Sequence, residues 1–431
     1  MKVRIFAILF VILAGAAVSF AVFKDNKEKD DSYTEYIELA VKNAEKDIPY
    51  NAVMYYRKAF EIRCADEETY EAYIKQCELL GRDFYYEAIN GYLKMFPDSP
   101  RAHEELCKYY FAGQDYKRVF EVALDAKERG IATDAVKEMF INSRYKYKYL
   151  KGGLAEATPF LGKYAKVKRD DFYGFIEDNG QFLLFPKYEE AGFFASDSTA
   201  VKEDGKWMMI NELGYKVAVC SGEPDEMSYI SNGIVPIKVG DKYGYTDTSL
   251  VLPESFPYDY ASNFRSDVAA VKKGEKWAII KSDSEYVTDF IFDDVIIDDF
   301  NTCINNGIIL ARQGSKYYLY DVTGTRISEN GYEYIYPFAS EEYAAFKSGD
   351  KWGFIDSAGQ VVIEPQFDEA KSFCIGLAPV KVGELWGYIN TDGKICIDCV
   401  FEDCIPFSSN GITAVKEQTG WSYIKLLLYT S

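Results

Sequence analysis

Three cysteines near the C-terminus have the residue type and spacing of a redox or metal site. Cys396 and Cys399 form the sequence Cys-Ile-Asp-Cys, and Cys404 follows closely. Thiolates at this spacing exchange disulfides or bind zinc. The nine cysteines form no even, clustered framework, and their odd total leaves at least one thiol free. The weight of this candidate depends on the structural elements that carry the three thiols.

Adjacent carboxylates form a second candidate. Asp293 precedes Asp294, and Asp298 precedes Asp299. Paired carboxylates serve as the acid and base of glycosidases or bind Ca²⁺. The chain holds 68 acidic residues, however, so adjacent pairs are also expected on a solvated surface.

No catalytic signature accompanies these candidates. The sequence contains no GxSxG, GxxxxGK or GxGxxG motif, and its one histidine, His103, lies in a helical stretch where a structural role is expected. A single histidine excludes an HExxH zinc motif and argues against a Ser-His-Asp triad. We therefore predict that the protein is not an enzyme, and we assign no catalytic, cofactor-binding or metal-ligating residue.

Charge and the N-terminal sequence suggest where the chain acts. The formal net charge is −19 over 431 residues, which disfavours nucleic acid as a partner. An uncharged apolar run from Ile5 to Phe23 is nearly long enough to span a hydrocarbon core of about 30 Å as a helix. Residues 1–23 are therefore expected to be an anchor in the cell membrane, or a signal peptide cleaved near Ala21, followed by a polar linker at residues 24–32. Both alternatives place the bulk of the chain outside the cytoplasmic membrane.

Residues 33–160 are expected to form paired helices. Apolar residues recur at intervals of three and four, as at Ala52, Tyr56 and Ala59. Units of about 34 residues, with small residues such as Ala88 and Ala123 where helices approach, resemble the tetratricopeptide repeat family. The resemblance implies a solenoid of helical hairpins that presents a groove to a peptide or protein. A generic helical spacer is the alternative.

Residues 161–431 repeat one β unit eight times. An aromatic residue recurs at spacings of 34 to 36 residues, with one spacing of 40, at Tyr173, Trp207, Tyr243, Trp277, Tyr317, Trp352, Trp386 and Trp421. Five residues before each stands a lysine or arginine. Seven residues after it, five copies place a glycine, namely Gly180, Gly214, Gly324, Gly359 and Gly393. Alternating apolar positions predict strands, and the glycine provides the positive φ of a tight turn. Each unit is predicted to be a three-stranded meander that stacks on its neighbours.

These columns resemble the WG-repeat family, also called KWG repeats, which is widespread in bacterial proteins. Residues 351–373 match most fully, whereas four copies lack the glycine after the aromatic, so the tryptophan column is predicted to be architectural. The resemblance implies an all-β repeat array without established chemistry. Closure into a propeller-like toroid would remove exposed sheet edges, while the short repeat leaves an open β-solenoid as the alternative. The last copy lacks its third strand, and the first hairpin near Lys166 is expected to provide a partner.

The repeat register also changes the interpretation of the thiols. The three cysteines occupy the positions that Val362, Pro365 and Ala370 occupy in the preceding copy. Small buried side chains are therefore favoured over a metal site, a redox site or a local disulfide.

The expected function is a non-catalytic, envelope-associated scaffold that binds a protein, a peptide or a cell-wall glycan through its repeat surfaces. A carbohydrate-active enzyme that uses acidic residues in a cleft of the β array is one alternative, and a structural spacer is another. An enzyme predicts that unlike residues from several copies converge on one pocket. We expect function where the copies differ.

Overall fold

The structure is a computed structural model that describes residues 27–195, 197–340 and 343–428. These residues divide into two compact units, with the boundary between Ser143 and Arg144. Within the described ranges, no helix is long and apolar enough to cross a membrane. We therefore correct the predicted localisation, because no described helix supports an anchor. The apolar run at residues 5–23, with its cleavage position at Ala21, lies outside the described residues.

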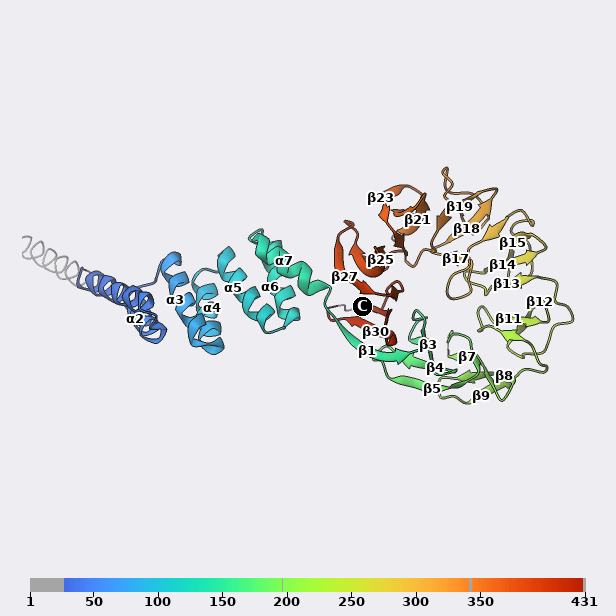
Figure 1. The fold of residues 1–431 in the computed structure, drawn as a ribbon, viewed down its shortest axis with the longest axis horizontal. Helices are drawn as coiled ribbons and strands as arrows, with labels where there is room; N and C mark the ends of the chain where they lie inside the picture. Colours follow the sequence, from blue (N-terminus) through green and yellow to red (C-terminus); the bar gives the residue numbers. More distant parts are fainter. Residues whose placement is uncertain (1–26, 196, 341–342, 429–431) are drawn as a thin grey trace, which may run out of the picture. The chain divides into compact units, whose positions relative to one another are not determined.

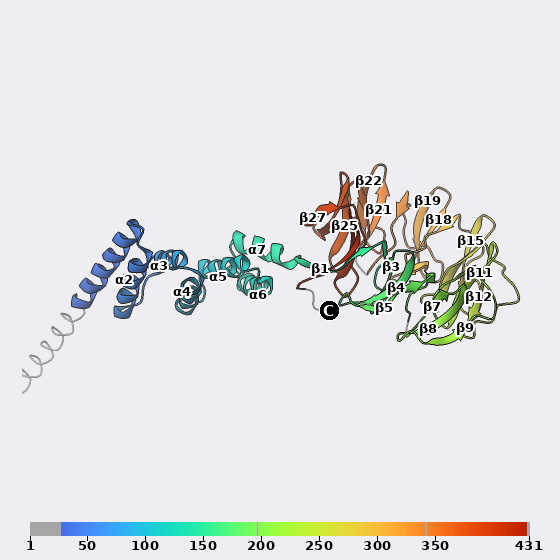
Figure 2. The ribbon, with the colours of Figure 1, turned by 60° about the horizontal axis from the view of Figure 1, so that its bottom comes forward.

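The first unit is helical. Residues 27–45 form one helix, and six further helices follow: α2 (Pro49–Ile62), α3 (Glu67–Leu80), α4 (Arg82–Met95), α5 (Pro100–Ala112), α6 (Tyr116–Glu128) and α7 (Asp134–Arg144). Side-chain caps set several of the starts. Asp66 accepts a hydrogen bond from the Thr69 amide at 2.8 Å, and Ser99 accepts one from the Ala102 amide at 3.1 Å. Connections of a few residues make successive helices pack side by side (Figure 2).

Aromatic side chains and alanines form the core of the helical unit. Tyr70 stacks on Phe60 and Tyr92, with ring centroids 5.2 and 5.4 Å apart. Ala52 and Ala59 of α2 are fully buried, as the helical periodicity of the sequence predicts. The tetratricopeptide resemblance itself remains a prediction.

The second unit is built of strands. Its described residues form eight antiparallel sheets, which follow one another around a ring (Figure 1). Blade 1 contains β2 (Glu156–Ala157), β3 (Tyr164–Arg169), β4 (Phe172–Glu177) and β5 (Phe182–Tyr188). Blade 2 contains β6 (Glu190–Ala191), β7 (Ser198–Glu203), β8 (Lys206–Asn211) and β9 (Lys216–Val219). Blade 3 contains β10 (Glu226–Met227), β11 (Ile234–Val239) and β12 (Lys242–Asp247). Blades 4 and 5 contain β13 (Tyr260–Ala261), β14 (Val268–Lys273), β15 (Lys276–Lys281); β16 (Asp294–Val295), β17 (Ile304–Asn305), β18 (Ile308–Gln313) and β19 (Lys316–Tyr320).

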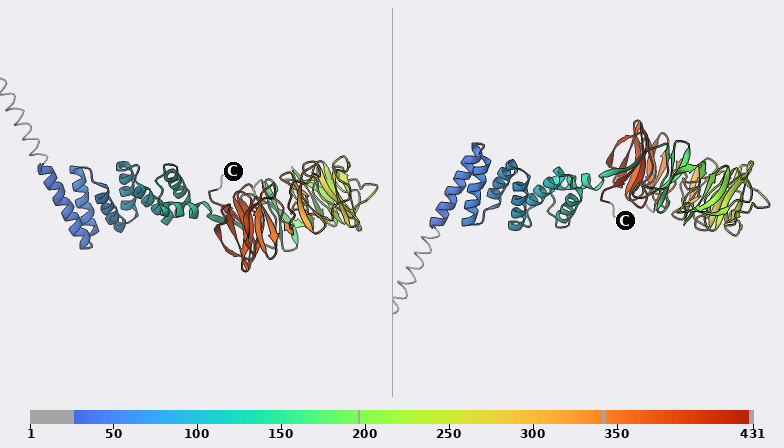
Figure 3. Two further views of the ribbon diagram at one scale, coloured as in Figure 1. Left: turned by 90° about the horizontal axis from the view of Figure 1, so that it is seen from above. Right: turned by 90° about the horizontal axis from the view of Figure 1, so that it is seen from below.

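Blades 6 to 8 complete the ring. Blade 6 contains β20 (Tyr334–Ile335), β21 (Ala344–Ser348), β22 (Lys351–Ile355) and β23 (Val361–Phe367). Blade 7 contains β24 (Glu369–Ala370), β25 (Leu377–Val382), β26 (Leu385–Asn390) and β27 (Ile395–Phe401). Blade 8 contains β28 (Asp403–Cys404), β29 (Ile412–Glu417), β30 (Gly420–Leu426) and β1 (Tyr147–Leu154). The unit is an eight-bladed β-propeller, and Figure 3 shows its blades from two further directions. The open β-solenoid is therefore excluded.

Two sequence expectations need correction. Each repeat is not a three-stranded meander, because a two-residue strand such as β24 lies on the inner side of each sheet, pairing with the second strand. The closing strand also differs from the one expected. It is β1, which pairs with β30 from Tyr147 opposite Leu426 to Leu154 opposite Trp421. These residues precede the hairpin near Lys166 and lie within the range 33–160 that was expected to be helical.

One row of residues crosses each blade and explains the repeated columns. In blade 7, Glu369 lies opposite Lys381, Lys381 opposite Trp386, and Trp386 opposite Phe401. The Lys381 ammonium lies 2.8 Å from the Glu369 carboxylate. The lysine or arginine found five residues before each aromatic is its cross-strand partner in all eight blades. The cation column therefore joins the inner strand to the aromatic column.

A recurring aspartate that directly precedes the inner strand holds the hairpin turn of its blade. In blade 7 the Asp368 carboxylate accepts a hydrogen bond from the Gly383 amide at 2.7 Å and lies 2.8 Å from the Lys351 ammonium of blade 6. Asp259 and Asp293 make the same two kinds of contact. The lysine contacts hold the pKa of these aspartates below the usual value. The lysine that precedes Trp352 in the sequence therefore clamps one blade to the next.

The glycine after the aromatic allows the outer strand to approach. In blade 7 the outer strand bulges between Ile397 and Phe401. A Cβ atom added at Gly387 would lie 2.5 Å from the Ile397 carbonyl oxygen and 2.8 Å from the Asp398 carbonyl carbon. Blade 8 has Ser422 in place of this glycine. The outer strand of blade 8 provides a glycine instead, because a Cβ atom added at Gly152 would lie 2.8 Å from the Ser422 hydroxyl oxygen.

This close approach predicts a cost for Gly387→Ala. The added methyl group meets backbone, so the outer strand must shift, and we expect the free energy of unfolding to fall by about 1–3 kcal/mol. Urea unfolding followed by tryptophan fluorescence measures it in the β unit, because all five tryptophans lie there. Ala278→Gly, at the same position of blade 4, is the control, with an expected loss of about 1 kcal/mol or less. Equal losses in the two variants would show that close approach is not the reason for the glycine.

Candidate functional site

The one long repeat carries a loop that crosses the centre of the ring. Residues 296–303, here called the central loop, connect β16 to β17 in blade 5, and β17 lies on the inner side of the ring in Figure 1. The loop makes contacts three blades away. The Phe300 ring lies 5.2 Å from the Phe193 ring of blade 2, and its carbonyl accepts a hydrogen bond from the Tyr229 hydroxyl of blade 3 at 2.7 Å. The extra residues of this repeat therefore occupy the centre.

Blade 4 fixes the next part of the central loop. The buried Asn263 side chain accepts a hydrogen bond from the Asn301 amide group at 2.9 Å, and the Asn263 backbone amide donates to the Asn301 carbonyl at 2.7 Å. The Tyr260 hydroxyl donates to the Asn301 side chain at 2.5 Å. Asn301 itself has a φ of 57°, a conformation that asparagine tolerates better than most residues. The loop is thus held by specific polar contacts.

Asp298 organises the loop and pairs with Arg265. Its carboxylate accepts hydrogen bonds from the Thr302 amide at 2.7 Å, the Thr302 hydroxyl at 2.9 Å and the Phe300 amide at 3.1 Å. The Arg265 guanidinium lies 3.1 Å from the same carboxylate and also donates to the Asn305 side chain at 2.5 Å. Both charges are therefore satisfied within the protein.

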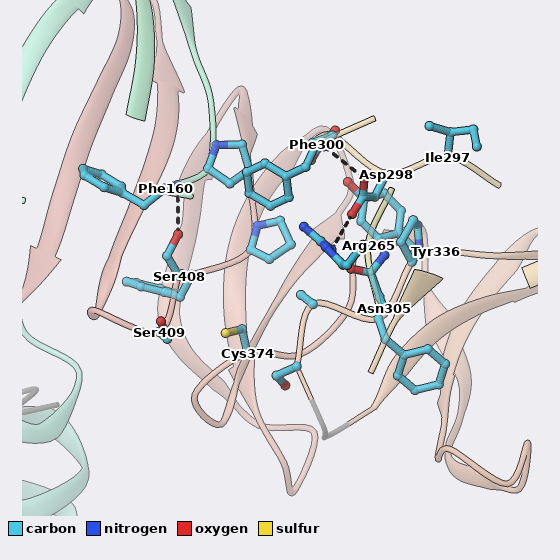
Figure 4. A pocket seen from close by; sticks show the side chains of 18 of the residues that line it. Phe160, Arg265, Ile297, Asp298, Phe300, Asn305, Tyr336, Cys374, Ser408 and Ser409 are labelled. Atoms are coloured by element: carbon cyan, nitrogen blue, oxygen red, sulfur yellow. Dashed lines mark hydrogen bonds and ion pairs between the residues drawn. The ribbon is translucent and has the colours of Figure 1, made fainter. Parts of the chain in front are cut away.

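A pocket opens beside the central loop, on the face formed by the loops between inner and second strands. We call it the mouth pocket. Its volume is about 500 Å³, and residues of blades 1, 4, 5, 6, 7 and 8 line it. In Figure 4, Phe160 and Ser408 lie on one side of the space, and Arg265, Asp298 and Tyr336 lie on the other. Aromatic residues and three prolines form about half of the wall, including Phe160, Phe300, Tyr336, Phe338 and Phe407.

A second cavity lies along the inner strands of blades 1 to 4. Its volume is about 520 Å³, and Asp299 and Asn301 of the central loop contribute to its lining. Lys166 lies in this wall, where its ammonium donates to the Ala191 carbonyl at 3.0 Å and burial lowers its pKa. The central loop thus takes part in both cavities.

The candidate carboxylates have different roles. Asp293 clamps a turn, and Asp294 accepts a hydrogen bond from the Tyr317 hydroxyl at 2.5 Å. Asp298 supports the central loop. Asp299 is exposed where it lines the mouth pocket, and partial desolvation by the surrounding loops and the neighbouring Asp298 charge raise its pKa. The structure therefore does not bring two free carboxylates together in this pocket.

The cysteines and the histidine lie outside the mouth pocket, apart from Cys374 in its wall. Cys404 is fully buried, and burial raises the pKa of its thiol to about 12. Cys396 and Cys399 are half-buried, whereas their positions in the repeat predicted buried side chains. Within the described ranges, no group of three or more potential ligands is placed to hold a metal ion. His103 is buried in the helical unit, with Nδ1 2.9 Å from the Ser99 carbonyl oxygen.

The predicted repeat positions lie in the blades and not in the pocket. The aromatic column sits in the third strands, buried in Trp207, Trp277, Tyr317 and Trp386 and half-buried in Tyr173, Tyr243, Trp352 and Trp421. The five glycines of the turn column have φ between 76° and 82°. The two copies without glycine also use positive φ there, at Leu250 and Ser284.

Sequence reasoning missed the residues that build the pocket. Asn263 and Arg265 belong to one loop of blade 4 and Phe300 belongs to the central loop of blade 5, and no column marks them. The one signal was the repeat spacing of 40 residues between Trp277 and Tyr317, because the extra residues form the central loop.

Comparisons with known proteins identify the repeat. The family described as WG containing repeat matches residues 173–207, 256–277, 327–352, 352–386 and 386–420. No curated protein matches the sequence. Among solved structures, a eukaryotic initiation factor is 14% identical, with 66% of this chain and 88% of that chain covered and a TM-score of 0.43. PorZ of Porphyromonas gingivalis, a surface component of the type-IX secretion system, is 9% identical, with coverage of 62% and 42% and a TM-score of 0.35. Kluyvelomyces marxianus Hsv2 is 11% identical, with coverage of 52% and 86% and a TM-score of 0.34.

Proposed function

The C-terminal unit of this chain is a propeller that contains WG repeats, and we propose that it is a non-catalytic scaffold that binds another protein at the mouth pocket. The supporting observation is that the residues shared by the copies and the residues of the pocket have different roles. The residues that the copies share pair strands, clamp turns and fill blades, whereas residues that recur in no other copy, among them Arg265, Asp299 and Phe300, meet at one pocket. Recognition is expected where the chemistry is specific to this chain.

Convergence of unlike residues on one pocket was also the expectation for an enzyme. The charged groups present favour binding. Asp298 is fixed by Arg265 and by three hydrogen bonds, which leaves Asp299 as the single available carboxylate among the described lining residues. Acid and base catalysis of glycoside hydrolysis requires two.

The wall of the mouth pocket favours a protein over a glycan. Its lining is rich in phenylalanine, tyrosine and proline, and the polar groups of Arg265, Asp298 and Asn305 already bond to one another. A glycan has many hydroxyl groups that need hydrogen-bond partners, whereas apolar side chains of a protein do not. A pocket of this volume accommodates one or two such side chains.

We expect Ser409→Trp and Ala339→Trp each to abolish capture of the partner. Both residues are exposed at the rim, so a large side chain fills the pocket without disturbing the core. The full-length chain, immobilised, is exposed to extract of the cells that produce it, and bound proteins are quantified by mass spectrometry. Ser315→Trp, in a turn on the opposite face of the ring, is the matched control and should bind normally.

Two outcomes would contradict the proposal. Partner capture unchanged by both rim substitutions would remove the mouth pocket as the binding site, and retention of polysaccharide instead of protein would favour a glycan. The spacer alternative is tested in the same assay by deleting residues 33–143. This deletion preserves β1, which the ring needs for closure.

The helical unit offers a second surface for this scaffold. A groove of about 610 Å³ is lined by Glu68, Glu71, Glu78, Glu104 and Glu105 together with Lys75, Arg101 and Lys108. Acidic residues outnumber basic ones there, so a basic segment of a partner is the complementary ligand. Loss of capture on deletion of residues 33–143 would support this role.

A further inference from the structure

The mouth pocket carries one unused charge. Three charged residues line it in the described part of the chain, namely Arg265, Asp298 and Asp299. The first two neutralise each other, with the guanidinium 3.1 Å from the carboxylate. The Arg265 side chain also lies over the Phe300 ring, 5.5 Å from its centroid. The net negative charge of the pocket therefore resides on Asp299.

Asp299 has no partner of its own in the structure. No hydrogen bond or ion pair to its carboxylate is formed by the described residues, and the side chain is exposed to water at the pocket. Lys371 acts on it through its charge, but the Lys371 ammonium is already bonded to the Asp403 carboxylate at 2.9 Å and to the Cys404 carbonyl at 2.6 Å. Desolvation and the Asp298 charge raise the pKa of Asp299, so a cation beside it would be stabilising.

The fold does not require this carboxylate. The central loop is held by Asp298, by the Phe300 carbonyl and by Asn301, and none of these contacts involves the Asp299 side chain. A charged group that the fold leaves unpaired in a cavity is a candidate binding group.

The rest of the wall suits the body of a cationic side chain. Phe160, Phe300 and Tyr336 present aromatic rings, and Pro337 and Ile297 add apolar surface. The methylene chains of lysine and arginine pack on apolar surface, and their cationic ends interact favourably with ring faces. An anionic group would meet Asp299 and Asp298 without a free cation to pair with.

We propose that the mouth pocket accepts a lysine or arginine side chain of the partner protein, with its charge at Asp299 and its methylene chain against the aromatic wall. This inference rests on the proposed function and names the chemistry of the group that enters the pocket.

The test uses model compounds and the full-length chain. Side-chain carboxyl groups of aspartate are labelled with ¹³C, and the Asp299 signal is identified by its absence in Asp299→Asn. N-acetylarginine methylamide and N-acetyllysine methylamide are titrated to their solubility limits, with N-acetylcitrulline methylamide as the neutral analogue. We expect a saturable shift of the Asp299 signal with at least one cationic probe, and about tenfold weaker binding of citrulline. No saturable shift with either cationic probe, or equal binding of citrulline, would overturn the inference.

Partner capture separates this inference from the proposed function. We expect Asp299→Asn to reduce capture about tenfold, and Asp350→Asn, an exposed carboxylate in a turn on the opposite face, to leave capture unchanged. Capture that is lost in Ser409→Trp but intact in Asp299→Asn would refute the cationic side chain and leave the pocket as the binding site. Capture that survives both substitutions would refute the proposed function as well.

Discussion

Replacing strand β1, Tyr147–Leu154, with a glycine-serine sequence of equal length is expected to remove most of the stability of the propeller. The substitution leaves β30 without its outer partner and deletes Leu154, which is 1% exposed. Loss of one large buried side chain alone costs about 2–5 kcal/mol. Domains have about 5–15 kcal/mol of stability in total, so losing the strand pairing in addition leaves little margin.

Side-chain contacts of β1 with blades 7 and 8 increase the expected loss of stability. The Tyr149 hydroxyl donates to the Glu417 carboxylate at 2.6 Å, and the Tyr147 ring lies 6.3 Å from the Phe401 ring of blade 7. Strand β1 therefore joins blade 8 to its neighbour as well as completing it. Without it, β30 becomes an unpaired outer edge of blade 8.

Urea unfolding followed by tryptophan fluorescence measures the loss, and limited proteolysis locates it, with the first cuts expected in β28 to β30. The control replaces Lys216–Val219 of β9 by glycine and serine. This outer strand of blade 2 closes nothing and is mostly exposed, so a much smaller loss is expected. A similar loss in both variants would mean that closure contributes no special stability.

Strand β1 also shows where sequence reasoning reached its limit. The columns of the eight repeats predict strands because their side chains alternate between core and solvent at a fixed spacing. The segment YKYLKGGL precedes the first column and includes two glycines, so nothing in its own pattern assigns it to a sheet. Its strand conformation comes from pairing with β30, which lies more than 260 residues away along the chain.

The inner strands were missed for a related reason. A strand of two residues, such as β24, is too short to show alternation. Its place is fixed by Lys381 of the second strand, through the ion pair with Glu369. The lysine or arginine column was visible in the sequence, but the residue opposite it in the inner strand varies among glutamate, aspartate and tyrosine.

The candidate site was predictable only as a place where the copies differ. Asp298 and Asp299 are adjacent and identical in type, so their sequence gives no reason to separate them. Arg265, from the preceding repeat, pairs with Asp298 and leaves Asp299 unpaired. The distinction depends on loops of blades 4 and 5 meeting at the centre of the ring, which no local pattern encodes.

The tryptophan column, in contrast, allows a comparison of two tryptophans that occupy the same repeat position but are buried to different extents, Trp386 and Trp352. Trp386→Ala is expected to lower the free energy of unfolding of the β unit by about 3–5 kcal/mol. The Trp386 side chain is 5% exposed, lies opposite Lys381 and Phe401, and has the Lys371 ammonium 4.8 Å from its ring centroid. Trp352→Ala removes the same side chain from a half-buried site, so about half that loss is expected.

Trp386→Tyr tests the architectural role of the column directly. In the three blades that carry tyrosine, its hydroxyl donates to an acidic residue of the inner strand, as Tyr243 does to Glu226 at 2.8 Å and Tyr317 to Asp294 at 2.5 Å. Glu369 provides that acceptor in blade 7. The tyrosine variant should therefore lose less than about 1.5 kcal/mol. Urea unfolding monitored by the four remaining tryptophans measures all three variants. If tyrosine were as destabilising as alanine, or if Trp352 and Trp386 contributed equally, burial within the blade would not account for the column, and a direct role of the indole in recognition would have to replace it.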